Sequence, residues 1–94
     1  MFGLSNENYS KILKIISKYK YEFYIFGSRA KNKYKYNSDI DIAIKGNVSP
    51  KEEMSIRNDF DMLDIPYTVD LVFIQKIEKA SLLKSIKEEG IKLE

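Results

Sequence analysis

The segment that most constrains the fold is DIDIAI, residues 39–44, in which acidic and apolar residues alternate. Strict alternation is typical of a β-strand whose two faces meet different environments. Residues two apart share a face of a strand, so Asp39 and Asp41 project together while the three isoleucines point the other way, into the core. The chain is therefore expected to build a sheet with one apolar face and two carboxylates on the other.

The remaining periodicity predicts a single α/β (α+β) domain over residues 1–94. Ser49, Pro50 and Glu52 form a capping box with proline at the first helical position, which places the start of a helix there. We expect a mixed central sheet of about three to five strands, flanked by about three to four helices. The predicted helices cover residues 7–19, 50 to the break at Ile65-Pro66, and 80–89; the predicted strands cover residues 22–26, 39–45, 69–74 and 91–93.

The amino acids that are missing narrow the chemistry. The chain has no cysteine and no histidine, which excludes disulfides, thiolate nucleophiles, an imidazole base and the usual zinc ligands. Oxygen ligands remain, and these suit hard cations such as Mg²⁺ or Mn²⁺. The net charge of +2 is too small to indicate a nucleic-acid partner by itself.

A third carboxylate repeats the pattern of an acid within an apolar strand. Asp70 is the one charged residue in the predicted strand VDLVF, residues 69–73. If this strand pairs with the one that carries Asp39 and Asp41, all three acids converge, and they repel one another unless a cation lies among them. Taken singly, each acid has a simpler interpretation, which is a solvated position on a half-exposed strand.

The loop between the first two strands begins with Gly27 and Ser28. A glycine without Cβ lets the backbone approach phosphates, and Ser28 offers a hydroxyl and an amide at the start of a predicted short helical turn. Arg29 is placed to contact a triphosphate, although an arginine after a turn is also often a solvated surface residue. Residues 29–36 carry four positive charges and two tyrosines, which fits a triphosphate clamp, a partner-binding surface or a mobile loop.

Together these residues resemble the signature of the DNA polymerase β-like nucleotidyltransferase superfamily, and the length resembles its smallest branch, the minimal nucleotidyltransferases. The carriers of the resemblance are Gly27-Ser28-Arg29-Ala30, Ser38-Asp39-Ile40-Asp41 and Asp70. The resemblance implies transfer of a nucleoside monophosphate from a triphosphate, such as ATP, to a hydroxyl with two Mg²⁺ ions. It makes Asp39, Asp41 and Asp70 catalytic metal ligands and Gly27, Ser28 and Arg29 nucleotide-binding residues. Relatives often have arginine where this chain has Lys31, so Lys31 is given no catalytic role.

The resemblance also implies a partner. Many minimal nucleotidyltransferases are antitoxins that place AMP on a tyrosine of a HEPN-type RNase toxin, and this is the function we expect. Two alternatives stay open: a binding module that silences the toxin by stoichiometric contact, and a nucleotidyltransferase that acts on a small-molecule hydroxyl. The longest apolar runs, such as residues 23–26, are too short to cross a bilayer, so we expect a cytoplasmic protein without membrane contact.

Overall fold

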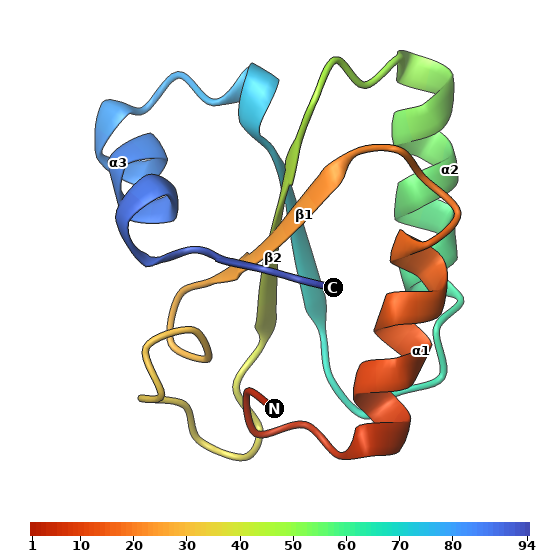
Figure 1. Ribbon diagram of the computed structural model, residues 1–94, viewed down its shortest axis with the longest axis vertical. Coiled ribbons are helices and arrows are strands. Elements are labelled where there is room, and N and C mark those ends of the chain that lie inside the picture. The colour runs from red at the N-terminus through yellow and green to blue at the C-terminus, as the bar shows by residue number, and fades with distance from the viewer.

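The computed structural model describes residues 1–94 and has three layers, with a four-stranded sheet between helices (Figure 1). The elements follow in the order α1 (Asn6–Ile16), β1 (Glu22–Phe26), β2 (Ile40–Lys45), α2 (Pro50–Asp61), β3 (Val69–Phe73), the short 3₁₀ helix η1 (Ile74–Lys76), α3 (Ala80–Glu89) and β4 (Ile91–Lys92). The prediction of an α+β domain with a mixed sheet is confirmed.

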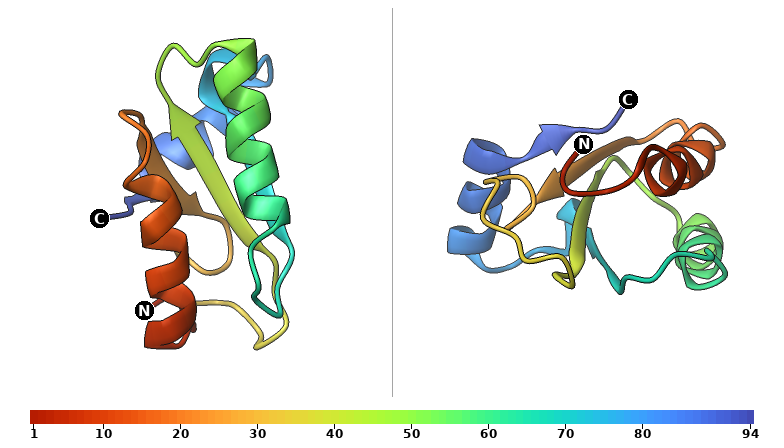
Figure 2. Two further views of the ribbon diagram at one scale, coloured as in Figure 1. Left: turned by 90° about the vertical axis from the view of Figure 1, so that its right-hand side faces the viewer. Right: turned by 90° about the horizontal axis from the view of Figure 1, so that it is seen from below.

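The sheet has the strand order β3-β2-β1-β4, with β2 and β1 in its centre. Strand β1 is antiparallel to both β2 and β4, whereas β2 and β3 are parallel. Helices α1 and α2 cover one face of the sheet and α3 lies on the other, as the view along the layers shows (Figure 2). The parallel pair matters most for the site because it brings β3 beside the DIDIAI segment.

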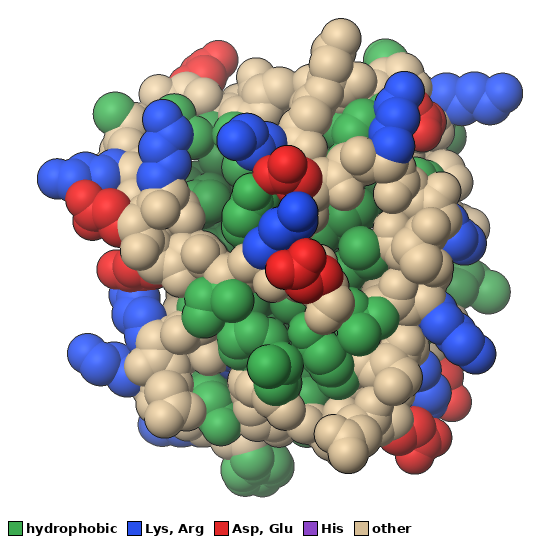
Figure 3. Space-filling view, in the orientation of Figure 1, with side chains coloured by type: hydrophobic (Ala, Val, Ile, Leu, Met, Phe, Trp, Pro, Cys, Tyr) green, Lys and Arg blue, Asp and Glu red, His purple; other side chains and the backbone are tan.

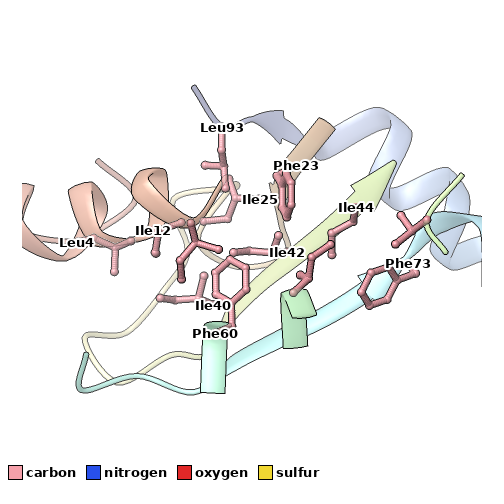
Figure 4. Packing of buried hydrophobic residues seen from close by; sticks show 13 residues of the cluster. Leu4, Ile12, Phe23, Ile25, Ile40, Ile42, Ile44, Phe60, Phe73 and Leu93 are labelled. Atoms are coloured by element: carbon pink, nitrogen blue, oxygen red, sulfur yellow. The ribbon is translucent and has the colours of Figure 1, made fainter. Parts of the chain in front are cut away.

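The main core lies between the sheet and the pair α1 and α2. Ile40, Ile42 and Ile44 are completely buried there, together with Ile12 of α1 and Ile56 of α2 (Figure 4). A smaller cluster, formed by Phe26, Ala43 and Ile86, lies under α3 on the opposite face. The predicted inward direction of the three isoleucines is confirmed.

Two helix ends differ from the predictions. Helix α1 ends at Ile16 rather than at residue 19, and the hydroxyl of Ser17 donates to the carbonyl of Lys14, one of the orphan acceptors at a helix end. Helix α2 starts as predicted, with the Ser49 side chain accepting from the amide of Glu52, but it ends at Asp61, well before Pro66. A helix usually ends at or before the residue that precedes a proline, but nothing requires that the helix reach that residue.

The strands agree more closely, and one difference affects the site. Strand β1 and helix α3 have the predicted bounds, while β3 ends at Phe73 and β4 covers two residues. Strand β2 begins at Ile40, so Asp39 lies just outside it. The first residue of the acidic pair is therefore held by the preceding loop and not by the strand.

The edge of the sheet at β4 faces the viewer in Figure 1, and there acidic and basic side chains lie close together among apolar ones (Figure 3). Charged side chains on an exposed strand edge oppose pairing with a further strand.

None of the helices has the length and apolar character that crossing a membrane requires.

Candidate active site

The parallel pairing of β2 and β3 brings two of the three acids side by side. Asp41 and Asp70 are direct partners across the two strands, so their side chains leave the same face of the sheet. On its other side Asp41 is paired with Phe26, the last residue of β1, which is followed by Gly27. The site thus forms where β1 ends and where β2 and β3 begin, on the face opposite the isoleucine core.

The electrostatics show that Asp39 belongs to the same group of charges. Partial burial raises the pKa of Asp41, and the negative charges of Asp70 and then Asp39 raise this pKa further. None of these three carboxylates takes part in an ion pair within the chain. The site therefore holds concentrated negative charge that the protein itself does not neutralise.

Gly27 contacts Asp41 so closely that no side chain fits between them. Its φ is +74°, a conformation that suits glycine, and a Cβ at this position would lie 2.5 Å from Oδ2 of Asp41. The backbone then forms a tight turn in which the amide of Lys31 donates to the carbonyl of Gly27. The amides of Ser28, Arg29 and Ala30 donate to no backbone carbonyl, which leaves N–H groups at the first turn, as an anion-binding backbone requires.

This turn corresponds to the predicted helical turn at Ser28, but it is a single turn and not a helix. Asn32 adopts φ +60° and ends it, and the amide of Lys33 folds back to the carbonyl of Ser28. Gly27, Ser28 and Asp41 are thus brought together. Their contacts with a nucleotide stay a prediction.

Arg29 lies apart from the acids, in the interior of the loop. It is 1% exposed, so the alternative of a solvated surface arginine is wrong. Its guanidinium donates to the carbonyls of Phe2, Tyr36 and Ser38. A direct contact with a triphosphate stays a prediction, and it would require this buried side chain to become exposed.

The sequence patterns did not reveal the contact between Lys31 and Glu89. Lys31 Nζ lies 3.1 Å from the Glu89 carboxylate at the end of α3, so the Gly27 turn is tied to the helix on its own side of the sheet. A sequence separation of 58 positions hides such a pair. The one available signal was the opposite charge of Lys31 and Glu89.

The donor chemistry of the acids fits a hard divalent cation. All three groups offer carboxylate oxygens, the preferred ligands of Mg²⁺. Burial first, and then the charges of Asp70 and Asp39, raise the pKa of Asp41, so a nearby cation would stabilise its charged form. No three acidic side chains are already grouped tightly enough to hold an ion. Binding would therefore require a rearrangement of these side chains.

A pocket of about 200 Å³ lies between α3 and the sheet, lined by Tyr24, Lys45 and Ile86 among others. None of the three acids lines it. Tyr24 pairs with Ala43 in the sheet, so this pocket lies further along the strands than the acids. The candidate site is consequently an open surface at the end of the strands and not a closed cavity.

Comparison with known families identifies the arrangement. The model of the nucleotidyltransferase domain family matches residues 7–93, nearly the whole chain. The chain belongs to this family. The resemblance noted from the sequence is thereby confirmed. Nucleotidyl transfer is the activity of this family. No curated protein sequence matches the chain closely enough to count as a relative.

Solved structures place this nucleotidyltransferase domain beside minimal nucleotidyltransferases. A toxin–antitoxin complex with AMP-PNP is similar with 27% identity and a TM-score of 0.68, over 93% of this chain and 73% of the other. The MntA–HepT toxin–antitoxin complex is similar with 25% identity and a TM-score of 0.63, over 96% and 72%. A complex of a tri-AMPylated HEPN toxin with its MNT antitoxin from Shewanella oneidensis shares the fold, with 24% identity, a TM-score of 0.64 and coverage of 97% and 72%.

Proposed function

We propose that this chain transfers AMP from ATP to a tyrosine hydroxyl of a HEPN-type RNase toxin and thereby acts as its antitoxin, in the cytoplasm. The observation that carries the proposal is the uncompensated group of Asp39, Asp41 and Asp70 beside the Gly27 turn, in a chain of the nucleotidyltransferase family. The similar complex with AMP-PNP supports an adenine nucleotide as donor.

The reaction joins the acceptor oxygen to the α-phosphorus of ATP and breaks the bond to the β-phosphate oxygen. Pyrophosphate leaves, and the proton of the hydroxyl passes to a carboxylate or to water. Two Mg²⁺ ions, when bound, would stabilise the attacking and the leaving oxygens. Asp39 and Asp41 would help to hold both ions, and Asp70 would help to hold the ion that acts on the acceptor hydroxyl.

The chain's own backbone has a second task in this proposal. Phosphate oxygens need donors, and the amides of Ser28, Arg29 and Ala30 lie in the turn that follows Gly27. Because Gly27 leaves no Cβ above Asp41, the phosphates and the carboxylates can approach the same place. The turn would therefore orient the triphosphate against the acids.

The experiment that tests the proposal compares the parent chain with Asp41→Asn, each mixed with purified partner toxin, ATP and MgCl₂. Mass spectrometry of the toxin should show added AMP with the parent chain. The initial rate should fall at least about 100-fold with the variant, because a proposed ligand of the ions that stabilise the transition state is lost. Toxin binding should persist, since the substitution changes no atom outside the site. If Asp41→Asn inhibited the toxin as well as the parent does, the chain would be a stoichiometric antitoxin instead.

A parallel assay separates the acceptor classes. The chain is incubated with ATP, Mg²⁺ and a small-molecule hydroxyl such as an aminoglycoside, with no toxin present. We expect no transfer above the rate of the Asp41→Asn variant. Efficient modification of the small molecule, together with none of the toxin, would contradict the choice of a protein acceptor.

A further inference from the structure

Arg29 is the only charged residue that the fold buries. No carboxylate neutralises it; instead its guanidinium carbon lies 5.3 Å from the ring centre of Tyr34 and 4.7 Å from that of Tyr67. Aromatic faces attract a cation, and this attraction is stronger away from water. The two rings therefore hold a permanently charged side chain within the loop that connects the Gly27 turn to the acids.

The hydrogen bonds of this guanidinium join parts of the chain that are distant in sequence. Nε and Nη2 donate to the carbonyl of Ser38 at 3.1 and 2.7 Å, Nη1 donates to Phe2 at 2.8 Å and Nη2 also to Tyr36 at 3.4 Å. No buried side-chain nitrogen or oxygen is left without a partner. The planar fork of arginine can satisfy several acceptors at once, which the single ammonium group of lysine cannot do in the same geometry.

These contacts lie close in sequence to the two acids that the sheet holds least firmly. Asp41 lies within β2 and has strand partners on both sides. Asp70 lies on β3, which is an edge strand, and Asp39 precedes β2. Ser38, bound twice by Arg29, is the neighbour of Asp39, and Tyr67, stacked on Arg29, is three residues before Asp70.

A backbone hydrogen bond connects the same two segments. The amide of Ile40, next to Asp39, donates to the carbonyl of Thr68, next to Tyr67, at 2.9 Å. Arg29 thus contacts the segments that lead into both strands, two residues before their first paired residues, Ile40 and Val69. A displacement of its side chain would release Ser38 and Tyr67 together.

From this geometry we infer that Arg29 is a positioning residue, which holds Asp39 and the start of β3 so that Asp39 and Asp70 meet Asp41 around a divalent cation. The inference rests on the proposed function, because it assigns a role in cation binding. It differs from the sequence-based expectation that Arg29 contacts the triphosphate. A contact residue would affect nucleotide binding, whereas a positioning residue affects cation binding in the absence of any nucleotide.

The test measures Mn²⁺ binding to the full chain by electron paramagnetic resonance, without nucleotide, for the parent and for Arg29→Lys. We expect the variant to bind Mn²⁺ about 10- to 100-fold more weakly, the range for residues that orient metal ligands. The matched control is Arg57→Lys, which changes the chain's other arginine, an exposed residue of α2. Combined with Asp39→Asn, Arg29→Lys should cause a smaller further loss than it causes alone, because part of its effect acts through Asp39.

Hydrogen exchange at the Ile40 amide supplies a readout that does not depend on metal. Arg29→Lys should speed exchange at Ile40 while the amides in the centre of β2 keep their protection. If the parent chain binds no Mn²⁺, the proposed function fails, and this exchange rate still decides whether Arg29 orders the segment. Unchanged Mn²⁺ affinity, or unchanged exchange at Ile40, overturns the inference. Should Arg29→Lys fail to fold, Tyr67→Leu removes one stacked ring, and the same two results are required of it.

Discussion

Successive residues of the six-residue strand β2 point to opposite faces of the sheet, and the two faces serve opposite purposes. On the face toward α1 and α2, Ile40, Ile42 and Ile44 are completely buried in one large cluster. On the other face, Ala43 is buried under α3 but Asp41 is only half-buried and lies among like charges. One face stabilises the domain, and the other accepts electrostatic repulsion that only a bound cation or a proton would relieve.

This difference shows where the domain can accept unfavourable interactions. The face of the sheet toward α1 and α2, the closed face, carries no acidic residue, so it supplies the apolar burial that a small domain needs. The opposite face, the open face, is covered by α3 over part of its length only, and the acids occupy the part nearer the Gly27 turn. Neutralising an acid on the open face should therefore raise stability, whereas truncating an apolar side chain on the closed face should lower it.

The largest effect is expected from Ile42→Ala on the closed face. The substitution removes a fully buried side chain and leaves a cavity, which costs roughly 2–5 kcal/mol of unfolding free energy. Urea unfolding followed by circular dichroism measures the loss. The control is Asp41→Asn, one residue away on the open face, which should not destabilise the chain; equal losses for both variants would contradict the division between the faces.

Gly27→Ala should have the next largest effect and should damage the site as well as the fold. Its positive φ strains an alanine by about 1–3 kcal/mol, and the new Cβ would displace the carboxylate of Asp41. Both unfolding free energy and affinity for ATP, measured by calorimetry, should decrease. Gly46→Ala is the matched control, because Gly46 also has a positive φ and a crowded Cβ position but lies against Tyr21 at the other end of β2; it should lower stability and leave ATP affinity unchanged.

The closed face could be predicted from the sequence, whereas the structure of the loop that carries Arg29 could not. Alternation in residues 39–44 predicts both the strand and the inward isoleucines, because a strand has a fixed period of two. That Asp70 lies directly beside Asp41 requires the register of two strands separated by a helix, which local patterns do not determine. The burial of Arg29 depends on the rings of Tyr34 and Tyr67 and on the carbonyl of Phe2, contacts that loops form without periodicity.

The electrostatic difference between the faces predicts a pH effect. The pKa of Asp41 is raised in the folded chain, so the folded state binds a proton more tightly than the unfolded state and loses stability as pH rises through the window between the two values. Without divalent cations, Asp41→Asn should therefore melt a few degrees higher than the parent at neutral pH, and the difference should disappear at a pH below the ordinary range of an aspartate. Adding Mg²⁺ should stabilise the parent more than the variant. A variant that is less stable at neutral pH would show that the repulsion is not significant.

The smallest effect is expected from Lys31→Gln, which breaks the contact between the Gly27 turn and α3. Both side chains of the Lys31–Glu89 pair are substantially exposed, so the loss of stability should be below about 1 kcal/mol. Lys84→Gln, which breaks an exposed pair with Glu88 on the outer part of the same helix, is the matched control for stability. If Lys31 only fastens the turn, ATP affinity should change little and equally at low and high salt. A drop in ATP affinity that high salt abolishes would instead mean that Lys31 leaves Glu89 for the triphosphate, since long-range attraction between exposed charges is screened by salt.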